Sequence, residues 1–187
     1  MKQNILKGEK VYLRELIWDD APIIYEFMQE YDLVKYLAEL PRPYSIEHAY
    51  SFIDFALMES EEMKTTHFAI VDKGTDKFVG AIGLKDINFE EKTVETGYWV
   101  GKKYWGNGFV TDAILVLMNF CLKELKLEKI KAIVFESNES SIRVLKKCDF
   151  KYVGLSNKRY CNSLLNEPLL EFVYESVSRE KEVYERF

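Results

Sequence analysis

The chain has few of the residues that build disulfide frameworks or metal sites. Its 187 residues include three cysteines, Cys121, Cys148 and Cys161, without Cys-x-x-Cys spacing, and two histidines, His48 and His67. An odd number of scattered cysteines argues against a disulfide framework and predicts reduced thiols. Two isolated histidines are too few for a histidine metal site, so we expect no metal.

Long apolar runs and an excess of basic residues are also missing. The apolar run at residues 113–122, "AILVLMNFCL", is too short to cross a bilayer. The N-terminal stretch "MKQNILKGEKVYLREL" lacks the apolar core of a signal peptide. A net charge of −5 argues against a nucleic-acid-binding surface, which is usually basic. These absences predict a cytoplasmic protein that binds neither nucleic acid nor membrane.

The rest of the composition is typical of a globular protein. Hydrophobic residues make up 48% of the chain and charged residues 30%. No internal repeat, low-complexity tract or Pro/Gly/Ser-rich linker divides it. We therefore expect one domain over residues 1–187, which is long enough to bury a sizeable core.

The N-terminal part predicts one strand followed by two helices. Alternating apolar and polar residues indicate a strand at residues 11–16, and acidic residues ahead of Pro22 indicate a helix at 18–32. Ile23, Phe27 and Tyr31 are expected to share one face of that helix. Ser45 is a candidate cap for a helix at 46–59. The expected buried stripe of this second helix is Ala49, Phe52, Ile53 and Leu57.

From there the period of the apolar residues changes from about 3.6 to 2. The expected elements are strands at 67–71, 77–87 and 93–101, a helix at 111–126, a strand at 129–135, a helix at 138–148, and strands at 150–155 and 169–177. The order βααβββαβαββ predicts an α/β or α+β protein with a mixed sheet.

The stretch "KKYWGNGFVTDA", residues 102–113, places two glycines between a strand and a helix. It could be an ordinary turn, or a loop whose backbone N–H groups bind an anion at the helix N-terminus. A dinucleotide-binding fingerprint would need a third glycine where Thr111 stands. A nucleoside-triphosphate loop would need Lys-Ser/Thr where Phe109 and Val110 stand.

Two stretches together, "ETGYWVGKKYWGNGFVTDA" and "NESSIRVLKKCDF", are more specific. They resemble the GNAT superfamily of acetyl-CoA-dependent N-acetyltransferases, and within it the RimJ/RimL-like branch. The resemblance covers essentially the whole chain and is strongest from Glu95 to Phe150. It implies a mostly antiparallel central sheet flanked by helices, acetyl-CoA as co-substrate and no metal, and it makes a homodimer a candidate assembly.

The implied reaction moves acetyl directly to a primary amine. The branch favours the α-amine of a protein N-terminus, as on ribosomal proteins. A small amine such as a polyamine or an aminoglycoside remains an alternative, as does a non-catalytic module that senses acyl-CoA. A nucleotide-binding domain is remote, because both nucleotide fingerprints fail.

The resemblance also implies where the cofactor lies. The loop would wrap the pyrophosphate, the preceding strand would pair with the pantetheine arm, and the second motif would contact the region near the thioester. The implied cofactor-binding residues are Tyr98, Trp99, Val100, Lys103, Trp105, Gly106, Asn107, Gly108, Phe109, Val110, Thr111, Asn138, Ser141, Arg143 and Lys146.

The implied catalytic residues are Glu95 and Ser141. Glu95 would act as general base through water, and Ser141 would protonate the departing thiolate by its hydroxyl or a water it holds. A backbone N–H near Val100 would stabilise the oxyanion. Because transfer is direct, neither Cys121 nor Cys148 is needed as a nucleophile.

Three positions depart from the family pattern. Lys103 stands where Gln or Arg is common, which changes a bidentate phosphate contact into a single cation. Leu145 replaces the tyrosine that serves many members as general acid. Asp149 replaces a glycine, although Asp also tolerates the left-handed conformation.

Several of these residues have simpler explanations. Glu95 could be a solvated strand residue, Ser141 a helix cap, and Trp99 and Trp105 packing residues. His67 lies in an apolar strand and is expected to be packed. The run at residues 59–64 is expected to be a solvated helix end. The candidates for lining the acceptor pocket are Tyr12, Tyr36 and Tyr44, with the first two helices and residues 157–168 around it.

Overall fold

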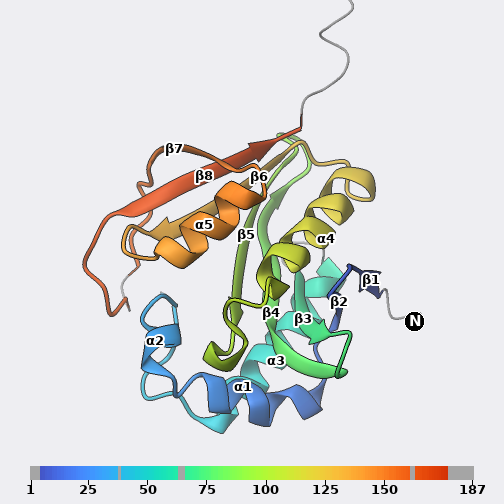
Figure 1. Ribbon diagram of the computed structural model, residues 1–187, viewed down its shortest axis with the longest axis vertical. Helices are drawn as coiled ribbons and strands as arrows, with labels where there is room; N and C mark the ends of the chain where they lie inside the picture. Colours follow the sequence, from blue (N-terminus) through green and yellow to red (C-terminus); the bar gives the residue numbers. More distant parts are fainter. Residues whose placement is uncertain (1–4, 38, 63–65, 161–162, 177–187) are drawn as a thin grey trace, which may run out of the picture.

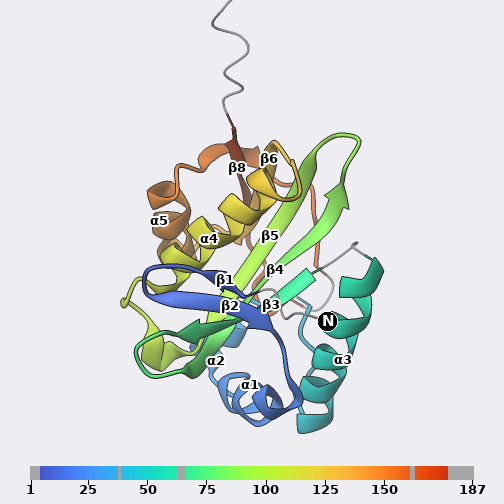
Figure 2. The same ribbon diagram turned by 90° about the vertical axis from the view of Figure 1, so that its right-hand side faces the viewer.

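The computed structural model describes residues 5–37, 39–62, 66–160 and 163–176 (Figure 1). Eight strands form a single sheet in the order β1-β2-β3-β4-β5-β6-β8-β7. Helices α4 and α5 cover one face of the sheet, and α1 and α3 cover the other (Figures 1 and 2).

The strands are β1 (Leu6–Lys7), β2 (Val11–Glu15), β3 (Thr66–Asp72), β4 (Lys77–Asn88), β5 (Thr93–Val100), β6 (Lys129–Phe135), β7 (Lys151–Leu155) and β8 (Leu169–Glu175). The α-helices are α1 (Ala21–Phe27), α2 (Tyr31–Val34), α3 (Ile46–Glu62), α4 (Phe109–Lys123) and α5 (Glu139–Lys147). Two short 3₁₀ turns, η1 (Trp18–Asp20) and η2 (Lys102–Tyr104), precede α1 and α4. This architecture confirms the expected mixed α/β class.

The pairing between β5 and β6 is the exception in a sheet that is otherwise antiparallel. These two strands are parallel, and their ladder covers Thr93–Thr96 against Lys129–Ala132. Beyond it β5 continues to Val100 along β4, while β6 continues to Phe135 along β8. The sheet therefore opens between β5 and β6 at their carboxyl ends.

The helix predicted at residues 18–32 is wrong as a single helix. Helix α1 ends at Phe27 with Met28 as its C-cap, and α2 starts again at Tyr31. The break changes the direction of the chain, so Phe27 is buried while Tyr31 is 63% exposed. Tyr31 consequently does not share the face of Phe27.

A first strand, β1, was not predicted. It is two residues long and pairs with β2 through Leu6 and Leu13. A segment of this length contains no period, so only its pairing defines it.

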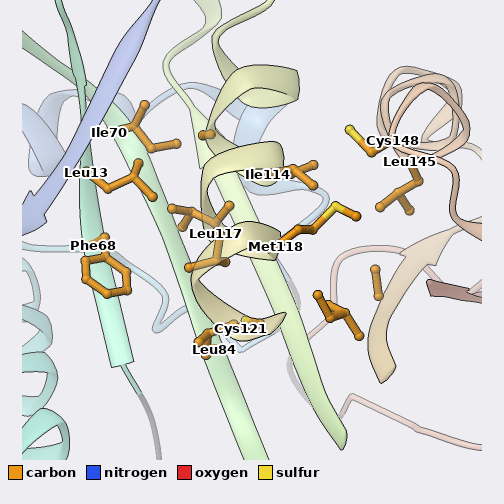
Figure 3. Close-up of a cluster of buried hydrophobic side chains, with 14 of the residues drawn as sticks. Leu13, Phe68, Ile70, Leu84, Ile114, Leu117, Met118, Cys121, Leu145 and Cys148 are labelled. Atoms are coloured by element: carbon orange, nitrogen blue, oxygen red, sulfur yellow. The ribbon is translucent and has the colours of Figure 1, made fainter. Parts of the chain in front are cut away.

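The core has two parts, one on each face of the sheet. On the α4–α5 face, Leu117 of α4 lies on the side of Leu13 and Ile70, whereas Ile114 and Met118 point toward α5 (Figure 3). On the other face, Ala49 and Ile53 of α3 are fully buried, and Phe52 and Leu57 pack beside them. The expected stripe of α3 is confirmed; the charge run at 59–64 lies outside the side chains that the structure describes.

His67 is a packed residue, as expected. Its ring lies 5.2 Å from that of Phe52 and 6.1 Å from that of Phe55, centroid to centroid. Its Nδ1 has no hydrogen-bond partner among the described residues. Burial lowers the pKa of His67 to about 4, so the ring is neutral and apolar contacts suit it.

Replacing Leu117 by Ala should lower the free energy of unfolding by about 2–5 kcal/mol, because the side chain is 2% exposed and leaves a cavity between α4 and the sheet. Leu115→Ala is the matched control on the same helix, since Leu115 is 49% exposed. Denaturant unfolding of both variants measures the difference. Equal losses for the two variants would contradict this packing.

Candidate functional site

A cleft of about 830 Å³ occupies the opening between β5 and β6. Its walls are residues 97–100 of β5 and 132–135 of β6, and it extends to the N-terminal ends of α4 and α5. Both strands present main chain there beyond the end of their shared ladder. A cleft of this size can hold an extended small molecule that adds to the strand edges.

The glycine loop forms the end of the cleft at α4. Gly106 and Gly108 both have φ of +80°, which side-chain-bearing residues rarely adopt. Gly108 is the N-cap of the 15-residue α4 and supplies no side-chain cap. Phe109, Val110 and Thr111 follow it and line the cleft. Their N–H groups and the helix dipole make this end suitable for an anion.

The loop is held from behind by the first hairpin. The Asp112 carboxylate accepts hydrogen bonds from the N–H groups of Lys10 at 2.8 Å, Val11 at 2.9 Å and Glu9 at 3.2 Å. The Lys10 ammonium donates to the Asn107 carbonyl at 2.9 Å. Sequence analysis missed Lys10 and Asp112, because their role depends on a hairpin about 100 positions away along the chain.

Of the three cations predicted to bind the cofactor, Lys103, Arg143 and Lys146, only Arg143 is among the lining residues. Arg143 lines the cleft, and so does Lys147, which sequence analysis missed. Lys146 is not among the lining residues. The spacing of four between positions 143 and 147 puts those two side chains on one face of α5, a signal that was available in the sequence.

Lys103 turns toward α1 rather than into the cleft. Its ammonium lies 3.2 Å from the Glu26 carboxylate and 5.0 Å from the centre of the Phe27 ring. The ion pair and the cation–π contact hold the Lys103 ammonium outside the cleft. Asn107 is also not among the lining residues, and its side-chain amide donates to the Tyr104 carbonyl at 3.1 Å.

Trp99 and Trp105, the two tryptophans nominated from the sequence, line the cleft and also contact neighbouring residues. Trp99 lines the cleft and contacts the rings of Phe27 and Phe78 edge-on, with centroids about 6 Å apart. The Trp105 indole N–H donates to the Val100 carbonyl at 2.9 Å, so this side chain closes the end of β5.

The start of α5 supplies the opposite wall. Asn138 is the N-cap, and its side-chain oxygen accepts the Ser141 N–H at 3.2 Å. Asn138, and not Ser141, therefore caps the helix. The Tyr98 phenol lies 3.5 Å from the Ser141 carbonyl, and burial raises its pKa, so it is a neutral hydroxyl. Ser141 also lines the cleft.

Two departures from the family pattern are accommodated by the fold. Leu145 is fully buried in the core and does not reach the cleft. Asp149 follows the end of α5 with φ of 63°, the left-handed conformation expected for this position.

Glu95 is not a solvated residue. Its side chain is 7% exposed and lines the cleft near the end of the β5–β6 ladder. One carboxylate oxygen lies 3.0 Å from the Lys85 ammonium, and the other lies 2.7 Å from that of Lys158. Lys158 also lies 3.1 Å from Asp86. The sequence does not predict these ion pairs around Glu95, because Lys158 belongs to the connection after β7 and is distant in the sequence.

The lysines remain charged in this setting. Burial alone would lower the pKa of Lys158, but its hydrogen bonds to Glu95 and Asp86 outweigh burial and raise the pKa. At Lys85, burial likewise opposes the charge, and the neighbouring Glu95 reverses the effect and raises the pKa.

One of the three tyrosines proposed for the acceptor pocket is in place. Tyr36 lines the cleft, and its hydroxyl donates to the Ser137 carbonyl at 3.3 Å. Tyr12 is wrong for this role, because it is not among the lining residues and its hydroxyl donates to Asp76 in the β3–β4 turn. Tyr44 is also wrong, since it packs beside His48 in the second core. Tyr160, from the β7–β8 connection, lines the cleft instead.

Besides Tyr36, thirteen positions nominated from the sequence as catalytic or cofactor-binding line the cleft: Glu95, Tyr98, Trp99, Val100, Trp105, Gly106, Gly108, Phe109, Val110, Thr111, Asn138, Ser141 and Arg143. The structure thus brings most of the nominated residues together, and their roles remain predictions. Cys121 and Cys148 are buried free thiols, and burial raises their pKa to about 12 and about 11. Cys161 lies outside the described residues.

Within the described part of the chain, no cluster of three or more His, Cys, Asp or Glu side chains has the arrangement of a metal site. Nor does any described helix combine the length and apolarity that a membrane span requires.

Comparison with known proteins decides the family. Residues 10–151 match the family model of the acetyltransferase (GNAT) domain. The chain belongs to the GNAT acetyltransferase family. The uncharacterized N-acetyltransferase p20 of Bacillus licheniformis is 29% identical over 150 residues, which cover 80% of this chain and 84% of p20. This GNAT protein is thus an N-acetyltransferase by family.

Solved structures agree with the fold. The ribosomal L7/L12 α-N-protein acetyltransferase RimL superposes with a TM-score of 0.80 at 13% identity, over 93% of this chain and 95% of RimL. The spermidine N-acetyltransferase of Vibrio cholerae, solved with CoA and spermine, gives 0.76 at 17% identity, over 89% and 95%. RimL is named for a protein N-terminus and the Vibrio cholerae enzyme for spermidine, so likeness of fold does not identify the acceptor.

Asp112→Ala should lower the free energy of unfolding of this GNAT domain by about 1–2 kcal/mol, because three N–H groups of the first hairpin lose their acceptor. Amide hydrogen exchange at residues 9–11 should become faster. The control is Asp54→Ala, which removes an exposed carboxylate from α3. Unchanged exchange at residues 9–11 would contradict the tether.

Proposed function

We propose that this protein transfers acetyl from acetyl-CoA directly to a primary amine, with the α-amine of a protein N-terminus as the acceptor. The observation that carries the proposal is one continuous cleft that runs from the glycine loop to Glu95. It joins an anion-binding end to a buried carboxylate, which are the two ends that this reaction needs.

The residues of the cleft fit acetyl-CoA. Two left-handed glycines and an uncapped α4 N-terminus are available for the pyrophosphate, and Arg143 and Lys147 add positive charge. The edge of β5 at residues 97–100 is available for the amides of the pantetheine arm. When bound, acetyl-CoA supplies a thioester carbonyl that an amine can attack.

The chain's own groups would handle the protons. Glu95 receives the proton of the acceptor ammonium, directly or through water, once Lys158 has moved from its carboxylate. The backbone N–H near Val100 is the donor for the oxyanion. Ser141 presents the hydroxyl for the departing thiolate. The raised pKa values of Cys121 and Cys148 keep both thiols protonated at neutral pH, which supports direct transfer.

The resemblance of the motifs to the RimJ/RimL-like branch supports an N-terminal α-amine, and a small amine is the second candidate because the fold neighbours include a spermidine N-acetyltransferase. The free, buried thiols support a cytoplasmic setting. A third candidate, a module that binds acyl-CoA without turnover, is separated from both by the following variant.

Glu95→Gln should reduce turnover about 10²–10⁴-fold, because the substituted side chain cannot accept a proton. Coenzyme A affinity, measured by calorimetry, should stay within the experimental error. Thiol release with acetyl-CoA and a panel of amines measures the rate, and Glu128→Gln, an exposed residue paired with Lys92, is the control. An active wild type with an unaffected Glu95→Gln variant would exclude Glu95 as base.

Ser141→Ala should slow thiol release, by about tenfold or more if the hydroxyl is the proton donor. The substitution leaves the cap of α5 intact, because Asn138 accepts the backbone N–H of position 141. Ser51→Ala is the control, because it removes an exposed hydroxyl from α3 away from the cleft. If both variants keep the wild-type rate, a different group protonates the thiolate.

A further inference from the structure

The acceptor end of the cleft holds a set of charges of both signs: Lys85 and Glu95 line it, while Lys158 and Asp86 adjoin Glu95 without being among the lining residues. Lys85 and Lys158 each contact a different oxygen of Glu95, and Lys158 also contacts Asp86. We propose that the acceptor carries a carboxylate close to its amine, and that Lys158 and Lys85 bind this carboxylate. This inference rests on the proposed function and names the acceptor's chemistry.

Neutrality of the set is the first support. Two carboxylates, Glu95 and Asp86, face two ammonium groups, Lys85 and Lys158, so the set has no net charge. A polycation would face both lysines. An acceptor with one ammonium and one carboxylate keeps the set neutral and gives every charge an opposite partner.

The position of Lys85 is the second support. It is on β4, directly opposite Glu95 in the β4–β5 register, so its backbone is fixed by the sheet. Its side chain is 35% exposed, and its ammonium lies 5.8 Å from the centre of the Tyr160 ring. Lys85, Glu95 and Tyr160 all line the cleft. A fixed cation that faces the cleft can recognise an anionic group of the acceptor.

The two partners of Lys158 are the third support. Its ammonium lies between Glu95, which is 7% exposed, and Asp86, which is 69% exposed. Asp86 can keep contact with the ammonium when Lys158 leaves Glu95. The acceptor's carboxylate then replaces Glu95 as a partner of Lys158, and Glu95 becomes free to take the acceptor's ammonium. Exchange of ion pairs avoids leaving a buried charge alone, which would be costly.

The test compares acceptors that differ only in a carboxylate. Peptides that begin Ala-Asp-Asp are compared with Ala-Asn-Asn and Ala-Lys-Lys, and alanine is compared with alaninamide. The first set tests a side-chain carboxylate and the second an α-carboxylate. Thiol release gives kcat/KM for each, with spermidine as the polycation. We expect the acid to exceed its amide about fivefold or more in at least one set.

The lysine variants assign the preference. Lys158→Met and Lys85→Met should bring the ratio of acid to amide close to one, and Lys158→Arg should retain it. Lys129→Met, which removes an exposed partner of Glu175, is the control. If Lys158 only pins the β7–β8 connection, kcat/KM falls equally for every acceptor and the ratio is unchanged, which would overturn the inference. A wild type that prefers amides or spermidine would overturn it as well.

The proposed function can fail separately. If no acceptor is turned over, calorimetric binding of the same acceptors to the CoA-saturated protein replaces the rate. Tighter binding of the acids that is lost in Lys158→Met supports the anion site without catalysis. Equal binding of acids and amides rejects it.

Discussion

The end of the parallel ladder between β5 and β6 is the constraint on which the site depends. After Thr96 and Ala132 each strand follows its other neighbour, so the sheet opens without losing its core. The opening exposes strand edges, creates the volume of the cleft, and brings the start of α4 and the start of α5 to its two sides. A continuous ladder would fill this space with the sheet's own hydrogen bonds.

The two ends of the cleft are built by different means. At α4 the end of the cleft is formed by main chain, with glycines in the left-handed conformation and a helix N-terminus without a side-chain cap. Hydrogen bonds of Lys10 with Asn107 and Asp112 connect this loop to the first hairpin. At Glu95 side-chain charges are in balance, and each carboxylate oxygen already has an ammonium partner. Rigidity at the first end suits a constant cofactor, and exchangeable ion pairs at the second suit a selected acceptor.

The sequence predicted what depends on local pattern. Alternating residues located the long strands, and the glycine motif located the start of α4, although its resemblance to a family was needed to connect it with Glu95 and Ser141. The break between α1 and α2 was missed, because the apolar spacing continues from Phe27 to Tyr31 although the helix ends at Phe27 and starts again at Tyr31. Lys158 was missed because ion pairs over 63 positions leave no trace in local periodicity. At Lys103 the sequence motif misled in the opposite way: the motif predicted a phosphate-binding cation, but the ammonium forms an ion pair with Glu26.

Amide hydrogen exchange, with and without coenzyme A, tests most directly whether the cofactor occupies this opening. Backbone amides of residues 97–100 on β5 and 106–111 at the glycine loop should become protected together when coenzyme A is added, because both would bind it through N–H groups. Protection confined to another part of the sheet, with these two segments unchanged, would contradict the placement of the cofactor and with it the assigned site.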